Sequence, residues 1–265
     1  MSRKPQAAAF FYGAPIGMLG GLIGLGGAEF RLPVLKAVFG YPIRRAIALN
    51  LAVSLLTLVA ALTVRLWVSP DPNALRPLLP VIGGLIAGSI FGAWFGASYA
   101  SRISVAQLHR WVLFLLVGIG MLLIAEGVVP WHSGGVPWGL ALRLPLAAVA
   151  GVGIGLVSSL LGVAGGELII PTLVFIFGAD IKIAGTASVL VSLPTVLSGL
   201  VRYVRGGAFE ERGDLGALIL PMGAGSIVGA FLGGVLVPYV SAGALKVGLG
   251  LILIISAVRI FRDRH

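Results

Sequence analysis

The chain has 265 residues, of which 58% are hydrophobic and only 11% are charged, whereas an ordinary soluble domain has about 25% charged residues. The mean hydropathy is +1.07. So few charges cannot cover the surface of a water-soluble protein of this size, which excludes a soluble globular fold and indicates an integral membrane protein. The absence of cysteine excludes disulfides, thiolate metal sites and cysteine nucleophiles.

The formal net charge of +10 does not indicate a nucleic-acid-binding protein. The 19 basic residues are scattered singly, in pairs and in triplets between apolar runs, and no basic domain could lie along a phosphate backbone. Lys and Arg accumulate in the short cytoplasmic loops of membrane proteins. We therefore expect acidic lipid headgroups, and no nucleic acid, as electrostatic partners.

The apolar runs predict an all-α polytopic membrane protein. About 20 apolar residues cross the ~30 Å hydrocarbon core as a helix. Eight long candidates occur at 8–27, 45–67, 77–99, 105–129, 141–163, 183–203, 215–237 and 242–261. Two further apolar segments, 30–40 and 168–178, reach only about half way across at about 1.5 Å per residue. We therefore predict eight long transmembrane helices and two half-helices.

The two halves of the chain are duplicated at an offset of 138 residues. Between 17–62 and 155–200, 16 of 46 ungapped positions are identical. The matches include Glu with Glu and Pro with Pro, which apolar composition alone does not produce. The predicted organisation is a first transmembrane repeat at 1–130, a connecting loop at 131–138 and a second repeat at 139–265.

Each repeat contains a long helix, a glycine-rich break and a short helix. The break and the proline after it comprise Gly26, Gly27 and Pro33 in the first repeat, and Gly165, Gly166 and Pro171 in the second. If each break is a hairpin tip inside the membrane, the halves are inverted. That scheme places 13 basic residues inside and five outside, with one at a tip, whereas parallel repeats give 11 and seven. The count favours inversion slightly. Repeats with broken helices are typical of secondary transporters, whose sites lie near the midplane.

The two broken segments resemble the TauE/SafE family of membrane transporters, the sulfite exporter or toluene-sulfonate uptake permease group. The first copy of the motif is GLGGAEFRLP at 24–33, the second is GVAGGELIIP at 162–171, and a small polar stretch GTAS follows at 185–188. The resemblance implies movement of sulfite, sulfonates, sulfoacetate or similar small anions. It further implies proton coupling and a location in the bacterial cytoplasmic (inner) membrane.

Glu29 and Glu167 are the most informative residues. An ionisable group at membrane depth costs about 2.5–3.5 kcal/mol on insertion scales, so it needs a partner or a wet cavity. Each glutamate could instead cap the short helix that follows it. Inverted hairpin tips would bring the two carboxyl groups together near the midplane. We therefore predict that they form a proton-coupling or binding centre.

Other polar residues in the predicted spans are candidates for the substrate path. Arg31 could bind an oxyanion through its planar fork, pair with Glu29 or lie at the interface. The other candidate residues are Asn50, Ser54, Thr186, Ser188 and Ser192. Hydroxyl groups at such spacings also bond to the preceding helical turn or to a neighbouring helix, so both interpretations remain open.

The residue types present in the chain argue against an enzyme. Three histidines and no cysteine supply neither a nucleophile nor a metal cluster, and no phosphate-binding G-x-x-x-x-G-K-[ST] loop is present. We expect no cofactor and no metal. The expected partners are a small anion, protons or another coupling ion, and lipids, while a homodimer is left open. An anion channel, or a transporter of another small carboxylate or metabolite, is the alternative function.

Overall fold

The computed structural model describes residues 3–69, 71, 73–99, 105–129, 139–161, 163–205 and 215–262, and all regular structure within these ranges is helical. The first half contains α1 (Arg3–Ile23), α2 (Ala28–Ala37), α3 (Ile43–Val68), a 3-10 turn (Arg76–Leu78), α4 (Leu79–Tyr99) and α5 (Val105–Val128). The second half contains α6 (Leu140–Leu161), α7 (Gly166–Pro171) with a π-helical turn (Thr172–Ile176), α8 (Ile181–Arg205), a π-helical turn (Leu215–Ile219), α9 (Leu220–Leu236) and α10 (Ala242–Arg262). The predicted connecting loop lies outside the described residues.

The two glycine-rich breaks separate a long helix from a short one, as the sequence predicts. Gly27 and Gly165 have φ values of 74° and 79° and immediately precede α2 and α7. This left-handed conformation is readily accessible only to glycine. The short helix α2 has 10 residues, and α7 with its π-helical turn covers 166–176. Both short elements therefore begin two residues earlier than the predicted segments 30–40 and 168–178.

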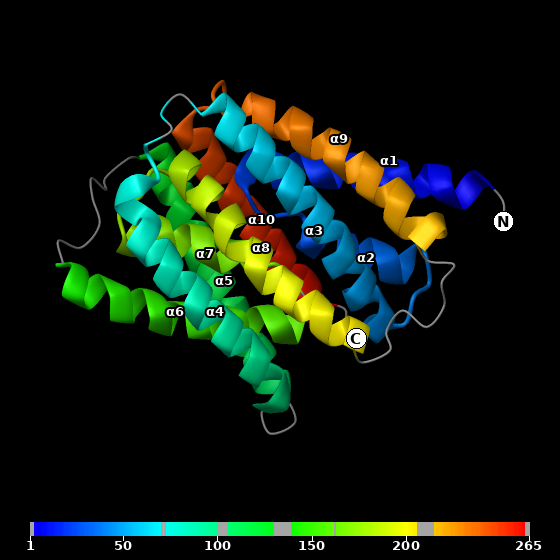
Figure 1. The fold of residues 1–265 in the computed structure, drawn as a ribbon, viewed down its shortest axis with the longest axis horizontal. Helices are drawn as coiled ribbons and strands as arrows, with labels where there is room; N and C mark the ends of the chain where they lie inside the picture. The colour runs from blue at the N-terminus through cyan, green and yellow to red at the C-terminus, as the bar shows by residue number, and fades with distance from the viewer. Residues whose placement is uncertain are drawn as a thin grey trace.

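Helices of one half pack mainly against helices of the other (Figure 1). Helix α1 packs along α9, and the equivalent helix α6 packs along α4. The equivalent helices α3 and α8 contact each other, as do α5 and α10. Each short helix lies against the long helix that follows it, α2 on α3 and α7 on α8. These helix pairs are therefore interchanged or kept when the two halves are exchanged.

The directions of these pairs follow from their contacts. Leu51 of α3 lies beside Gly199 of α8, whereas Arg65 lies beside Gly185, so the equivalent helices α3 and α8 are antiparallel. The contacts between α5 and α10 run in opposite directions in the same way. In contrast, Gly17 and Gly21 of α1 contact successively later residues of α9, so this pair is parallel.

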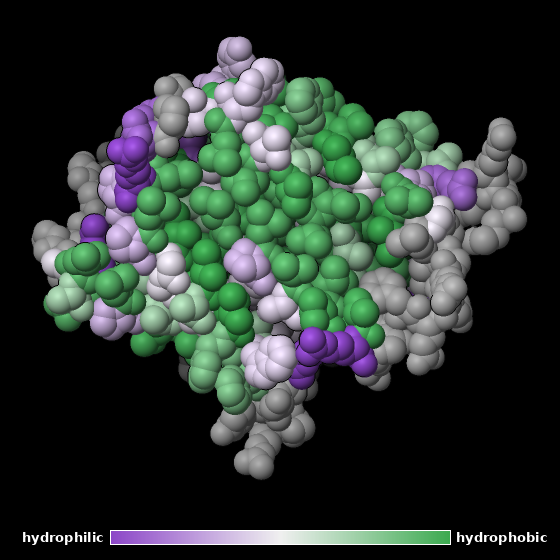
Figure 2. All heavy atoms as spheres, in the orientation of Figure 1, coloured by the Kyte–Doolittle hydropathy of each residue, from purple (hydrophilic) through white to green (hydrophobic). Residues whose placement is uncertain are grey.

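The surface of the bundle is apolar over most of the face in Figure 2. Large side chains such as Phe11, Trp67 and Phe114 are exposed by 72%, 75% and 64%, which fits lipid contact and not water. Among the described residues, five helices are long and apolar enough to cross a membrane, and four shorter apolar helices accompany them. A multi-pass membrane protein follows, while the count of eight spans stays a prediction.

Candidate functional site

Arg31 lies at the centre of a buried polar cluster. Its side chain has no solvent exposure. The two terminal nitrogens donate hydrogen bonds to Asn50 Oδ1 (3.4 Å), Ser54 Oγ (2.8 Å), the Gly26 carbonyl (3.3 Å), Thr57 Oγ1 (3.1 Å) and Ser226 Oγ (3.4 Å). The amide of Asn50 also donates to the Ala28 carbonyl at 3.0 Å. This one guanidinium group thus joins the glycine break, α3 and the second-half helix α9.

The two predicted glutamates are neighbours. Glu29 and Glu167 are exposed by 7% and 3%, and each carboxyl group lies within electrostatic range of the other. Glu167 Oε1 accepts a hydrogen bond from Ser256 Oγ of α10 at 3.1 Å. Both carboxyl oxygens of Glu29 are buried without a hydrogen-bond partner in the described part of the chain.

The glycine breaks of the two halves also meet. A methyl group added at Gly24 would overlap the backbone of Gly185, and one added at Gly166 would lie 3.1 Å from Leu25 Cα. Close contact between these backbones requires the small residue at each position. The arrangement places the acidic residue that follows each break on the boundary between the halves.

The second half repeats the first cluster without its cation. Ile169 occupies the position equivalent to Arg31, and Ser188 and Ser192 correspond to Asn50 and Ser54. Both serines are fully buried, and neither hydroxyl has a hydrogen-bond partner within the described ranges. Thr195, the equivalent of Thr57, shares a hydrogen bond of 2.8 Å with Ser89 of α4.

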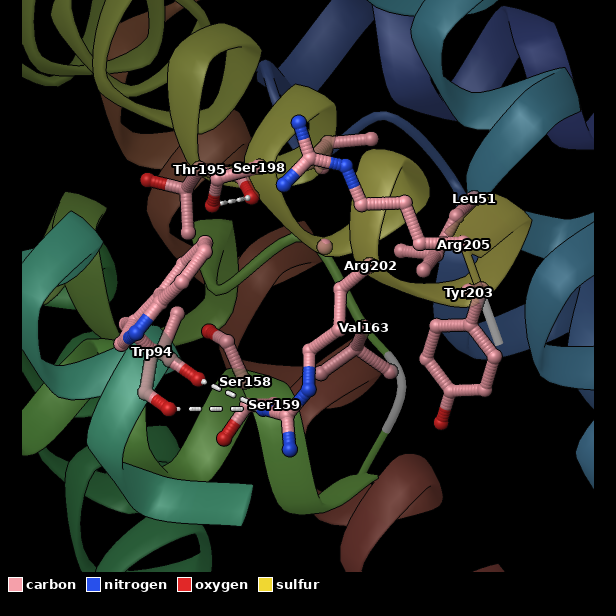
Figure 3. Close-up of a pocket in the computed structure, with 13 residues that line it drawn as sticks. Leu51, Trp94, Ser158, Ser159, Val163, Thr195, Ser198, Arg202, Tyr203 and Arg205 are labelled. Carbon is pink, nitrogen blue, oxygen red and sulfur yellow. Dashed lines mark hydrogen bonds between the residues drawn. The ribbon is translucent and has the colours of Figure 1, made fainter. Parts of the chain in front are cut away.

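A cavity of about 570 Å³ opens beside the C-terminal part of α8 (Figure 3). Arg202 and Arg205 project from α8 at its edge, and Ser158 of α6 and Thr195 lie along its wall. Arg202 Nη1 donates to the carbonyls of Ala93 and Trp94 of α4 at 3.4 and 3.5 Å. We name this space the first cavity.

A second cavity of about 540 Å³ lies at the opposite end of α8. Thr186 lines it, and so do Asp71, Asp180 and Lys182. Arg65 of α3, exposed by only 4%, forms part of the wall. The Arg65 guanidinium donates to the carbonyls of Gly21, Leu22 and Lys182 and to Thr186 Oγ1, at 3.0, 3.0, 3.3 and 3.2 Å. It therefore ties the end of α1 to the start of α8.

The structure thus brings most of the predicted site residues into one buried region. Glu29, Arg31, Asn50 and Ser54 gather at the first break, and Glu167 lies close to Glu29. Thr186 lies apart, because it bonds to Arg65 beside the second cavity. Among the described residues, no group of three or more His, Asp or Glu side chains could hold a metal ion.

The sequence analysis missed several polar residues of this region. Ser89 and Ser226 belong to a second repeated block, AGSIFGA at 87–93 and AGSIVGA at 224–230, and this repeat could have revealed them. Ser158 and Ser256 stand in apolar runs without any such signal. Arg65 was not among the predicted site residues, although its side chain is buried.

Comparison with known proteins identifies the family. The family model described as sulfite exporter TauE/SafE matches residues 1–123 and 129–265. The chain is 23% identical over 218 residues to the probable membrane transporter protein YdhB of Bacillus subtilis (strain 168), covering 82% of this chain and 84% of that protein. It is 28% identical over 113 residues to the probable membrane transporter protein YunE of the same organism, covering 43% and 39%. No solved structure gives a significant match.

The family match over nearly the whole chain and the apolar helical bundle both indicate a membrane protein of this family. The family model covers both glycine breaks and both buried glutamates. The chain is a multi-pass integral membrane protein that belongs to the TauE/SafE sulfite exporter family of membrane transporters.

Proposed function

We propose that the chain is a proton-coupled secondary transporter of small organic or sulfur-containing anions, such as sulfite, sulfonates or sulfoacetate, in the bacterial cytoplasmic membrane. One observation carries the proposal. Two cavities approach the same buried polar region from opposite ends of α8. A solute that moves between them has to pass the contact between the two halves.

The section between the cavities is short. Thr186 lines the second cavity and Thr195 lines the first. They are nine positions apart on the helix, which corresponds to roughly 14 Å at about 1.5 Å per residue. Ser188 and Ser192 lie in this section and are fully buried. A small rearrangement of the helices would therefore connect either cavity to these hydroxyl groups, as alternating access requires.

Glu29 and Glu167 are the proposed proton carriers. Burial disfavours an ionised carboxylate that lacks hydrogen-bond donors, and binding of a proton by Glu29 is therefore the proposed coupling step. The positive charge of Arg31 lies within electrostatic range and stabilises the ionised form when the proton leaves. Protonation also removes the negative charge that would repel an anionic substrate. Proton binding and anion binding are thereby coupled.

The proposal includes inverted repeats. Pro42 and Asp180 are equivalent under the 138-residue duplication. Pro42 immediately precedes α3, whereas Asp180 lines the second cavity together with Ser69 at the other end of α3. The antiparallel contact between α3 and α8 agrees with this placement. Halves whose equivalent helices are antiparallel are related by a two-fold axis perpendicular to those helices. The position of Asp180 and the antiparallel contact between α3 and α8 therefore both support inversion.

Flux into proteoliposomes tests this function. Purified protein is assayed with sulfite, a sulfonate, sulfoacetate and small carboxylates, with and without an imposed pH gradient. The proposal predicts saturable uptake of the sulfur oxyanions that a proton gradient accelerates. Uptake of carboxylates alone would assign the substrate to the alternative class. Unsaturable flux that ignores the pH gradient would identify an anion channel.

A further inference from the structure

The second half contains buried hydroxyl groups for which the protein supplies no partner. Arg31 donates to the hydroxyls of the first-half cluster, but Ile169 stands at the equivalent position. Ser188 and Ser192 are fully buried, and their hydroxyls are without partners among the described residues. Because buried polar groups are nearly always hydrogen-bonded, unpartnered hydroxyls on one helix are available to a bound polar molecule.

The first cavity leads to a third hydroxyl of this kind. Ser158 lines the cavity, is only 3% exposed and is likewise unpartnered in the described part of the chain. Ser158 Oγ lies against Gly165, and Ser188 Oγ lies against the next residue, Gly166. The inner end of the first cavity and Ser188 of α8 therefore adjoin the same glycine break.

The charge of the two cavities differs. Arg202 and Arg205 line the first cavity, and its described lining contains no acidic residue. In the second cavity the positive charges of Arg65 and Lys182 face Asp71 and Asp180, and the formal charges cancel. Positively lined clefts with low-dielectric walls concentrate anions. The first cavity is thus the one that attracts an anion.

Arg202 can bind a ligand with little loss of existing contacts. Its guanidinium group contacts carbonyl oxygens of α4 at 3.4 and 3.5 Å, which is long for an N–H···O hydrogen bond. Figure 3 shows its side chain extending along the cavity beside Ser158 and Ser159. A guanidinium fork matches the paired oxygens of an oxyanion.

We propose that a small oxyanion binds at the inner end of the first cavity, where Arg202 supplies the positive charge and Ser158 supplies a hydroxyl donor. Ser192 and Ser188 lie ten and fourteen residues before Arg202 on α8, and their hydroxyls continue the polar path beyond this site. The proposal rests on the proposed transport of small anions and specifies where the anion binds. Because Arg31 fills the equivalent cluster of the first half, each chain has one such site and not two. The two equivalent clusters have therefore diverged, because a guanidinium group fills the cluster of the first half and no group among the described residues fills that of the second.

Direct binding measurements on purified full-length protein in nanodiscs test the site. Sulfite and sulfoacetate are titrated calorimetrically into wild type, Arg202→Gln, Arg202→Lys, Ser158→Ala and the control Arg76→Gln. Arg76 is exposed and lines neither cavity, so its substitution makes the same charge change elsewhere. We expect Arg202→Gln to weaken binding about tenfold or more, consistent with loss of a hydrogen bond to a charged group. Arg202→Lys and Ser158→Ala should weaken it less, and Arg76→Gln should not change it.

A labelling experiment covers the case in which Arg202→Gln does not fold. The chain lacks cysteine, so Ser159→Cys in the first cavity and Ser69→Cys in the second each create a single thiol. Sulfoacetate should slow maleimide labelling at position 159 and not at position 69. Equal dissociation constants for Arg202→Gln and Arg76→Gln, or protection at position 69 alone, would overturn the site while leaving anion transport intact. Wild-type protein that binds neither anion and transports neither would overturn the proposed function, and this site with it.

Discussion

At the residue scale, the glutamates and Arg31 have different environments although they come from duplicated segments. Glu167 has a hydroxyl donor from α10, whereas Glu29 has none within the described structure. Arg31 has five acceptors around its two terminal nitrogens. Glu29 is therefore the glutamate that lacks a hydroxyl donor among the described residues, and Arg31 is expected to stabilise the cluster.

Replacing the glutamates should remove the response of transport to pH. Glu29→Gln keeps the shape of the protonated side chain, so the protein should fold and exchange substrate while losing acceleration by a pH gradient. Glu167→Gln should behave similarly. The comparison is anion flux into proteoliposomes at matched protein content, with Glu126→Gln as a control because Glu126 bonds to Lys246. Wild-type pH dependence in both variants would remove the glutamates from the coupling mechanism.

Replacing Arg31 should primarily reduce stability. Arg31→Met removes the donor from five buried acceptors, and each buried acceptor left unsatisfied costs about 1–3 kcal/mol. Arg76→Met removes an exposed arginine and is the matched control. Unfolding in detergent, followed by circular dichroism, should show a lower midpoint only for Arg31→Met. Equal midpoints would mean that the guanidinium group does not stabilise the fold.

At the element scale, glycines determine which helices can pack closely. Added methyl groups at Gly88 and Gly92 of α4 would overlap backbone carbonyls of α6, and the same holds for Gly225 and Gly229 of α9 against α1. The Gly-x-x-x-Gly spacing visible in the sequence thus identifies close-packing faces. The sequence did not identify the partner helices, because small residues permit contact without specifying which surface fills the space.

A pair of glycine substitutions on α4 separates packing from helix propensity. At Gly88 an added methyl group would overlap the Ala148 carbonyl, whereas at Gly83 it would meet no atom within 4 Å. Gly88→Ala should therefore destabilise the protein by about 2 kcal/mol, while Gly83→Ala should be neutral or stabilise it by up to about 1 kcal/mol. Detergent unfolding midpoints measure both. A Gly88→Ala variant as stable as Gly83→Ala would contradict the close contact between α4 and α6.

At the scale of the whole molecule, the duplication makes a topological prediction. Inverted repeats place Pro42 and Asp180, which are equivalent, on opposite faces of the membrane, with Asn73 on the same face as Asp180. Single cysteines at these three positions of the cysteine-free chain can be labelled with an impermeant maleimide in intact cells. Labelling of positions 42 and 180 from the same face would instead support parallel repeats.

Much of the architecture was predictable from particular residues. The glycine clusters predicted both breaks because Gly27 and Gly165 adopt a backbone conformation that other residues avoid, and the duplication singled out Glu29 and Glu167. The contribution of Ser158 and Ser256 was not predictable, since a serine in an apolar run also bonds to its own helix. The burial of Arg65 was not predictable either, because basic residues near helix ends usually face the membrane interface.

The central claim is that anion movement through the region between the two cavities is coupled to protons. Its most direct test is to load proteoliposomes with equal anion concentrations on both sides and then impose a pH gradient in either direction. With the membrane potential clamped, the account predicts net accumulation of sulfite or sulfoacetate. The direction of accumulation should reverse when the pH gradient is reversed. If the anion concentrations on the two sides stay equal under both gradients while tracer exchange is rapid, that result would contradict proton coupling.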